Sequence, residues 1–314
     1  MFNSYFMNNQ EEVNSITNRA SKLFKNTCVK FNELLKNSNE KITDNLIIYW
    51  DSSGNNNLNL FSDKNIIQNI HAKNHCYLSN KKICSNLVKN LKLNKYYPKT
   101  YNDLSEINDI LDDNLYFIKN IYSTAGKGVK CVIGKELLNN KINKNEIIQE
   151  GIVNLKLIDN KKFVIRAYII IFNNKIYLSK YMLSVVHGEK YIKTNTSYDI
   201  QINHNGYANK ESKPYLINIE ETEYSEYISK IRDALSNMKE LFNPLIENSN
   251  KKFIIIGPDI LINDKDEIKF IEFNTVPNLV HTKYINDNVN EEMLLDLFYL
   301  VFLNKQNDTL FLIE

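Results

Sequence analysis

The sequence lacks the features that mark a membrane or a secreted protein. No apolar stretch in its 314 residues approaches the roughly 18 residues of a membrane span. The first residues, MFNSYFMNNQEE, lack the basic and then apolar pattern of a secretion signal. The four cysteines, Cys28, Cys76, Cys84 and Cys131, show no C-x-x-C spacing, which favours free thiols in a reducing compartment. These absences predict a cytoplasmic protein.

The sequence also lacks a strong excess of charge of either sign. Its 39 Lys and Arg residues are scattered among 37 Asp and Glu residues, and the net charge is +2. Nucleic-acid binding usually needs a concentrated basic face, so we expect no nucleic-acid partner. Hydrophobic residues make up 43% of the chain and aromatic residues 11%, which is enough for a folded core despite the many Asn and Lys residues.

The pattern of apolar residues predicts an α+β protein with a mostly antiparallel centre. Helical spacing predicts helices over 12–38, within 80–98 and ending at Pro98, over 223–248, and over 290–304, the last one buried. Short apolar runs predict strands over 45–53, 115–121, 129–134, 146–152, 162–172, 175–186, 253–263 and 267–274. Asn-rich turns between several of these runs indicate antiparallel hairpins.

The hairpin FIKNIYSTAGKGVKCVIG, residues 117–134, is the first candidate ligand site. It carries Lys119 on its first apolar run and Gly126 and Gly128 in its turn. Glycines allow backbone amides to approach an anion without a side-chain clash. The Walker A spacing G-x-x-x-x-G-K-[ST] is absent, however. A plain structural hairpin is therefore the alternative to a phosphate-binding loop.

The strand pair near the C-terminal end holds a candidate metal site. Asp259 stands on one strand, and Glu272 and Asn274 stand two residues apart on the next, which puts these two on one face. Three oxygen ligands that face one way suit Mg²⁺. The alternative is a polar face that meets solvent. Because Glu272 has apolar neighbours, an unpaired carboxylate there would be costly to bury, which favours the metal site.

Arg166 is the third candidate. It is a lone arginine inside the apolar run KKFVIRAYIIIF, so it needs an anion, either a carboxylate of the protein or a phosphate of a ligand.

Six segments, taken in order, resemble the motifs of the tubulin tyrosine ligase-like family of the ATP-grasp superfamily. They span about residues 45 to 304 and read IIYWDSS, QNIHAKNHCYLSNKKICSNLVKNL, YYPKTY, KKFVIRAYIII, INHNGYANK and GPDILIND…KFIEFNTVPNL. The resemblance implies the ATP-grasp fold, with antiparallel sheets, flanking helices and a nucleotide site between two lobes. It divides the chain into an N-terminal helical extension (1–44), an N-terminal lobe (45–104), a central lobe (105–155) and a C-terminal lobe (156–314).

The resemblance also assigns roles to residues. ATP phosphates would be held by Lys119 and by Lys81 rather than its neighbour Lys82, under a loop formed by Gly126, Lys127 and Gly128. The backbone from Gln149 through Glu150 to Ile152 would meet the adenine. Mg²⁺ would be held by Asp259, Glu272 and Asn274. The site of phosphoryl transfer would be lined by Arg166, Asn205 and Lys210.

These roles predict an ATP-dependent carboxylate–amine ligase. Such an enzyme would form an acyl phosphate and add an amino acid, either tyrosine, glutamate or glycine, to a protein acceptor with an acidic tail such as tubulin. Two alternatives stay open. One is a catalytically silent relative that binds nucleotide or protein, and the other is a ligase that acts on a different substrate.

Three positions depart from the family pattern. Ile202 stands where the family has His, Val164 where it usually has Asp, and Val185 where many members have Arg. Loss of a buried acid together with a base is consistent with a compensated exchange, because buried charges are tolerated chiefly as pairs. These exchanges weaken the prediction of a particular amino-acid substrate.

A zinc site is a weaker alternative for one segment. His71 and His75 are four residues apart, and Cys76 and Cys84 follow, but the spacing matches no standard zinc motif. The N-terminal segment lies outside the resemblance, and we expect it to be a packing element.

Overall fold

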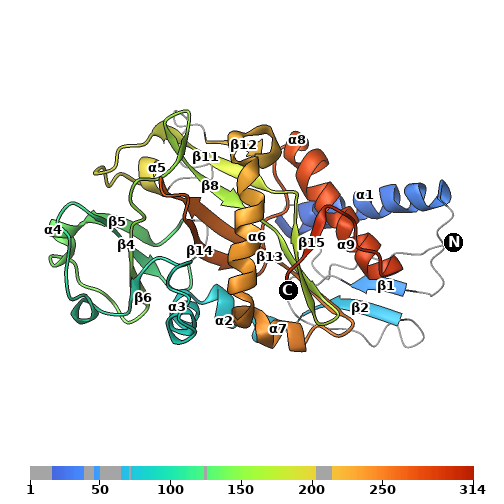
Figure 1. Cartoon of the computed structure of the whole chain (residues 1–314), viewed down its shortest axis with the longest axis horizontal. Coiled ribbons are helices and arrows are strands. Elements are labelled where there is room, and N and C mark those ends of the chain that lie inside the picture. The colour runs from blue at the N-terminus through green and yellow to red at the C-terminus, as the bar shows by residue number, and fades with distance from the viewer. Residues whose placement is uncertain (1–15, 39–45, 50–64, 71, 124–125, 203–213) are drawn as a thin grey trace.

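The fold is described from a computed structural model over residues 16–38, 46–49, 65–70, 72–123, 126–202 and 214–314. Two antiparallel sheets dominate it, a small one towards the left of Figure 1 and a large one at the centre. The predicted α+β class with antiparallel sheets is confirmed. No helix of the described ranges combines the length and the apolar character needed to cross a membrane.

The small sheet contains four strands within the described residues. Their order is β3 (Thr100–Tyr101), β6 (Glu146–Glu150), β4 (Leu115–Asn120) and β5 (Val129–Ile133), and all their pairings are antiparallel. Two short helical turns border this sheet, Leu104–Glu106 and α4 (Gly134–Leu137).

The large sheet contains eleven strands, counted over the described residues. Its main path runs β12 (Tyr215–Asn218), β11 (Leu183–Lys190), β8 (Lys161–Arg166), β13 (Lys252–Ile262), β9 (Ile169–Phe172), β10 (Lys175–Ser179) and β15 (Leu310–Leu312). The other strands are β14 (Ile268–Asn274) and β2 (Asn65–Asn69), which pair with β13, β7 (Leu157–Ile158), which pairs with β8, and β1 (Leu46–Tyr49), which pairs with β2. Of the described pairings, those of β2 with β1 and β13 are parallel.

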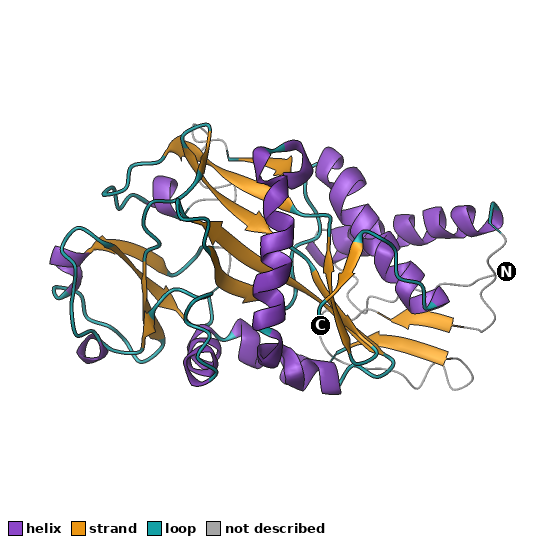
Figure 2. Cartoon of the chain, viewed as in Figure 1, coloured by secondary structure: helices purple, strands orange, loops and turns teal. Residues whose placement is uncertain are grey.

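The two faces of the large sheet bury different helices. Phe163, Ile165 and Ala167 point into one core together with α6 (Tyr227–Asn237), which crosses the sheet in Figure 2. Tyr168 and Ile170 point into the other core, because side chains alternate along a strand. Both cores are apolar, which explains the nearly unbroken hydrophobic runs of these strands.

Further helices complete the two layers. On the α6 side lie α2 (Ala72–Ser79), α3 (Lys81–Asn90), α7 (Asn243–Glu247) and the 3₁₀ turns Ile219–Glu221, Glu223–Glu226 and Lys239–Phe242. On the opposite side lie α1 (Ile16–Lys36), α8 (Lys283–Ile285), a π-helical turn over Asn286–Asn290 and α9 (Glu291–Leu303). A short helix, α5 (Tyr198–Gln201), follows β11.

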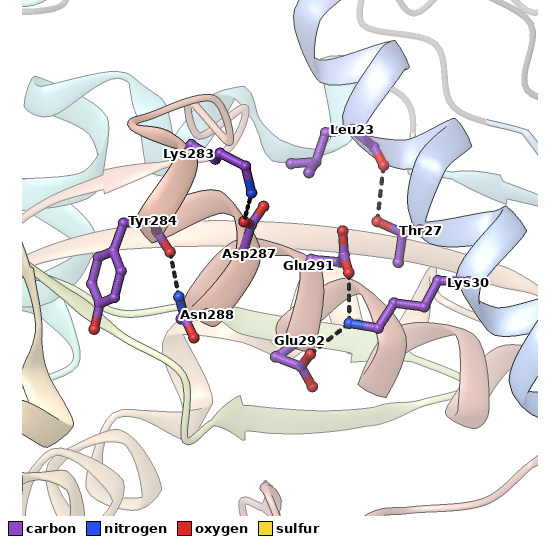
Figure 3. A network of polar contacts seen from close by, with 9 residues as sticks. All are labelled: Leu23, Thr27, Lys30, Lys283, Tyr284, Asp287, Asn288, Glu291 and Glu292. Atoms are coloured by element: carbon purple, nitrogen blue, oxygen red, sulfur yellow. Dashed lines mark hydrogen bonds and ion pairs between the residues drawn. The ribbon is translucent and has the colours of Figure 1, made fainter.

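Helix α1 packs against α9. The ring centroids of Phe24 and Phe31 lie 5.1 Å and 5.8 Å from that of Phe298. Lys30 Nζ pairs with Glu291 Oε1 at 2.6 Å and with Glu292 Oε1 at 2.9 Å, at the start of α9 (Figure 3). The N-terminal segment thus contributes to a core, as expected of a packing element.

Some boundaries differ from the sequence prediction. The helix predicted to end at Pro98 ends at Asn90, because Leu91 caps it and Lys92 has a left-handed backbone with φ 58°. The run 162–172 forms two strands, since β13 pairs with β8 through Asp259 and with β9 further back. Strands β2, β3, β7, β12 and β15 were not predicted. The predicted division of the chain into lobes stays a prediction.

Candidate active site

A cavity of about 750 Å³, open solvent at its mouth included, lies between the two sheets. The small sheet lines it with Phe117, Lys119, Val129, Gln149 and Glu150. The large sheet lines it with Lys162, Val164, His187, Asp259, Leu261, Ile271 and Glu272.

Lys119 and Gln149 are neighbours on the wall formed by the small sheet. Lys119 Nζ donates to Gln149 Oε1 at 2.5 Å, and Gln149 Nε2 donates to Thr100 Oγ1 at 3.2 Å. Both side chains are buried. Burial lowers the pKa of Lys119 to about 8, although the negative charge of Glu272 opposes the shift. The ammonium therefore has a neutral partner and only partial electrostatic compensation.

Lys81 is a buried residue of the cavity that connects three elements. It occupies the first turn of α3, where Asn80 caps the helix by accepting hydrogen bonds from the amides of Lys82 and Ile83. Lys81 Nζ donates to Ser123 O at 2.7 Å and lies 3.3 Å from Glu272 Oε1. Lys81 lines the cavity and Lys82 is not among the lining residues.

The glycine turn after β4 reaches the cavity through Gly126. Gly126 and Gly128 have φ of +72° and +65°, which glycine adopts readily and other residues do not. A Cβ at Gly128 would lie 2.7 Å from Ser123 Oγ, and one at Gly126 would lie 3.0 Å from Tyr198 Oη. Lys127 is exposed between them. The turn is closely packed, and its glycines are needed for its shape.

Three charged residues form a row across the large sheet. Arg166 on β8 is the register partner of Asp259 on β13, and Asp259 is the register partner of Glu272 on β14. Arg166 Nε donates to Asp259 Oδ1 at 2.7 Å. Burial opposes the charge of Arg166, but the carboxylate of Asp259 outweighs it and raises the pKa of the guanidinium. The anion that Arg166 needs is thus supplied by the protein, and the ion pair uses only the Nε of the guanidinium.

Asn274 completes the oxygen-rich part of this wall. Its Nδ2 donates to Gly257 O at 3.1 Å and to Asp259 Oδ2 at 3.3 Å. The amide oxygen makes no hydrogen bond to a described residue. Two carboxylates and one amide oxygen are hard ligands of the kind that Mg²⁺ shares with nucleotide phosphates, so these residues fit the ion chemically.

Lys162 and His187 are among the buried residues of the cavity that were not predicted from the sequence. Lys162 Nζ donates to Gln201 O at 2.7 Å and lies 5.2 Å from the ring centroid of Phe117. Burial lowers its pKa to about 8, and the charge of Lys119 acts in the same direction. His187 Nδ1 lies 3.0 Å from Ile200 O. Lys162 lies two and four residues before Val164 and Arg166 on one strand, so the period of two could have identified it.

The departures from the family pattern lie close together. Val164 and Val185 are register partners across β8 and β11, and both are buried. An acid and a base at these positions would face each other, so their joint absence leaves no single buried charge. Ile202 caps α5, lines the cavity and contacts the position of Gly126.

Not every predicted residue is placed. Asn205 and Lys210 lie outside the described residues, as does His71 of the alternative zinc site. Cys84 is buried and Cys76 is exposed, and the described part of the chain contains no group of three His, Cys, Asp or Glu residues able to hold a metal ion. Arg166, Lys127, Gly128 and Asn274 do not line the cavity themselves.

The architecture is similar to that of a known protein. The crystal structure of the C-terminal domain from K. lactis Pby1, described as an ATP-grasp enzyme interacting with the mRNA decapping enzyme Dcp2, superimposes with a TM-score of 0.64. The likeness covers 98% of both chains at 15% sequence identity. The sequence matches no protein-family model and no curated protein. At this identity the likeness shows the fold, and the chain has the ATP-grasp fold as predicted.

Proposed function

We propose that the protein is an ATP-dependent carboxylate–amine ligase of the tubulin tyrosine ligase-like type. The observation that carries this proposal is the cavity itself. It brings Lys81 and Lys119 together with Asp259 and Glu272, which come from four separate elements. Cations opposite hard oxygen ligands are the arrangement that a bound Mg²⁺–triphosphate requires.

Each residue has a role in the proposed reaction. Lys81 and Lys119 bind the phosphates, and the turn with Gly126, Lys127 and Gly128 covers them. The backbone of Gln149, Glu150 and Ile152 binds the adenine. Asp259, Glu272 and Asn274 would hold Mg²⁺, whose charge offsets the negative charge that the transferred phosphoryl group spreads over its oxygens.

The chemistry takes place beside Arg166. A carboxylate oxygen of the substrate attacks the γ-phosphorus of ATP, the bond to the β-phosphate oxygen breaks, and ADP leaves. Arg166 orients the carboxylate and the acyl phosphate formed from it. An amine then attacks the acyl carbon, inorganic phosphate leaves, and the amine loses a proton as the amide forms. Asn205 and Lys210 are proposed to line the same place.

The substrates in this proposal are an amino acid and a protein acceptor with an acidic tail. Tyrosine, glutamate and glycine are the candidate amino acids, tubulin is one candidate acceptor, and the cytoplasm is the proposed location. The likeness to a domain whose description names a protein partner is compatible with a protein acceptor.

The test is an incubation of the purified protein with ATP, Mg²⁺ and each amino acid in turn, over tubulin and over a cell lysate. We expect ADP release that depends on one amino acid, and a matching mass increase on an acceptor. A mass increase on a protein other than tubulin would identify a different acceptor. ATP bound but never turned over in any combination would contradict the proposal.

A second candidate is a catalytically silent ATP-grasp protein that binds nucleotide or a protein partner. It is favoured by Val164 and Val185, which make an apolar pair where the family pattern has charges. The same incubations separate it from a ligase, because it predicts nucleotide binding without release of ADP.

A further inference from the structure

His281 belongs to a polar cluster on the same face of the large sheet as Arg166. The cluster is built around Asn290, the last residue of the π-helical turn and fully buried. Asn290 Nδ2 donates its two hydrogens to Leu279 O and Asn286 Oδ1, each at 3.0 Å, and it also lies 3.0 Å from His281 Nδ1. Its Oδ1 accepts from Tyr168 Oη at 2.8 Å. Turns of π-helix often occur at functional sites.

This cluster fixes the protonation state of His281. The amide nitrogen of Asn290 must face Leu279, because a carbonyl oxygen accepts hydrogen bonds and cannot donate them. The same nitrogen lies 3.0 Å from His281 Nδ1 and cannot accept a hydrogen bond, so a proton on Nδ1 would point at the amide hydrogens, and Nδ1 is therefore unprotonated. The imidazole is then neutral and carries its proton on Nε2. Burial, and secondly the charge of Arg166, lower the pKa of His281 to about 4, in agreement with a neutral ring.

Two links place His281 beside Arg166. Arg166 and Tyr168 are alternate residues of the chain and point to the same side of the sheet. Tyr168 donates to the side chain of Asn290, which also contacts His281. The segment leading to His281 also passes Arg166, since a Cβ at Gly257 would lie 2.7 Å from Pro277 Cβ and 2.9 Å from Arg166 Cδ.

Both side chains keep donors for a ligand. Arg166 uses Nε for Asp259, and its two terminal nitrogens make no hydrogen bond to a described residue. His281 is partly exposed, and its Nε2–H likewise has no described hydrogen-bond partner. A guanidinium with free terminal nitrogens is suited to a carboxylate, whose two oxygens it binds in parallel.

We propose that His281 and Arg166 form the carboxylate-binding site of the substrate, in which His281 acts as a neutral hydrogen-bond donor. This inference rests on the proposed ligase function. A neutral donor holds an anionic oxygen without adding a second positive charge beside Arg166. It also cannot take the proton of the incoming amine through Nε2, which is already protonated. Its role is to bind and orient the carboxylate while the phosphoryl group is transferred.

Two substitutions separate this role from a structural one. In His281→Asn the amide oxygen can still accept from Asn290, but the distal donor is lost. In His281→Gln the amide nitrogen reaches the position of Nε2 and keeps the distal donor, whereas Asn290 loses an acceptor. We expect His281→Asn to unfold at the same temperature as the parent and to bind acetate at least tenfold more weakly. We expect His281→Gln to be less stable and to bind acetate within threefold of the parent.

Acetate binding is measured by NMR from the Arg166 Nε–H resonance of the full chain in the presence of Mg²⁺ and ADP, with sodium chloride at equal ionic strength as control. In parent protein labelled with ¹⁵N-histidine, the His281 signal should report the Nε2–H tautomer and should shift saturably with acetate. The reverse ranking of the two variants, an Nδ1–H tautomer or an acetate effect no larger than that of chloride would each overturn the inference. A shift with inorganic phosphate alone would overturn its assignment to a carboxylate.

None of these readouts needs turnover of ATP. A protein that binds acetate in this way but never releases ADP would disprove the ligase and leave the site standing. A ligase whose His281→Asn variant has an unchanged KM for its carboxylate substrate would disprove the site alone.

Discussion

The two walls of the cavity differ in how their charges are compensated. On the large sheet, Arg166 and Asp259 form an ion pair and Glu272 has Lys81 as its partner. On the small sheet, Lys119 is hydrogen-bonded to the neutral amide of Gln149 and forms no ion pair with a described carboxylate. The carboxylates of the large sheet thus have cationic partners without a ligand, whereas Lys119 on the small sheet and Lys162 on the large sheet are buried cations with no ion pair to a described carboxylate, and a bound anion would satisfy them. Under the proposed function, we expect the phosphates to lie beside these two lysines.

Loss of charge in the row of Arg166, Asp259 and Glu272 on the large sheet should have the largest effect on catalysis. We expect Glu272→Gln to lower the rate of Mg²⁺-dependent ATP turnover by about a hundredfold or more, the usual cost of removing one preorganised charge contact. Turnover is measured by ADP release, and circular dichroism checks that the fold survives. Glu247→Gln, at an exposed position, is the matched control. A near-normal rate for Glu272→Gln would remove this residue from the site.

Loss of the charge of Lys119 should separate nucleotide binding from the stability of the fold. We expect Lys119→Met to weaken Mg²⁺–ATP binding by more than tenfold and to abolish ligation, because the proposed phosphate contact is lost. The same change should raise the melting temperature, since it removes a buried cation that lacks an ionic partner. Calorimetric titration and thermal unfolding measure the two effects. Lys175→Met, on the surface, is the control, and a lower melting temperature for Lys119→Met would contradict the comparison.

The pH dependence of nucleotide binding tests these two lysines, one on each wall, without a mutation. Lys119 and Lys162 have pKa values lowered to about 8, so both lose protons as the pH rises above 8 in the free protein. A bound polyanion favours the charged lysines, and binding must then take up protons. Affinity for Mg²⁺–ATP should therefore fall by about tenfold per pH unit and per lysine between pH 8 and the ordinary lysine pKa near 10.4. Calorimetry in buffers of different ionisation enthalpy counts the protons, and a flat profile would refute the assignment.

Stability should respond to pH in the opposite direction over the same interval. The folded-state pKa of each lysine lies below its unfolded value, so the unfolded chain binds more protons between about pH 8 and 10.4. These two groups then make the free protein more stable as the pH rises through this interval. The Lys119→Met variant should show a weaker rise in denaturant titrations, because one of the two groups is missing.

The smallest effect should come from the glycine turn. Gly126→Ala places a side chain at φ +72° and close to Tyr198 and Ile202. We expect the strained backbone to lower the free energy of unfolding by about 1–2 kcal/mol. Because the turn covers the proposed phosphate site, the KM for ATP should rise several-fold. Lys127→Ala, at the exposed position between the glycines, should change stability little. Equal kinetics for parent and Gly126→Ala would show that this turn does not contribute to nucleotide binding.

The sequence was informative wherever a short apolar run determines the position of a strand. Such runs predicted the strands that carry Lys119, Arg166, Asp259 and Glu272, and the fold class is confirmed. Registers were not predictable, because the pairing of Arg166 with Asp259 joins positions 93 apart. The same holds for β12 and β15, which are four and three residues long and are defined by their neighbours in the sheet. The roles of the site residues stay predictions.

The packing of α1 on α9 has a consequence for the synthesis of the chain. Lys30 and its partner Glu291 are separated by 261 positions, and Phe31 rests on Phe298 of a helix that leaves the ribosome long after α1. The apolar side of α1 therefore lacks its contacts with α9 until the intervening residues have been translated, and exposed hydrophobic surface favours aggregation. A nascent chain that stops before α9 would keep this surface exposed, so chaperone binding to such chains should decline once α9 emerges.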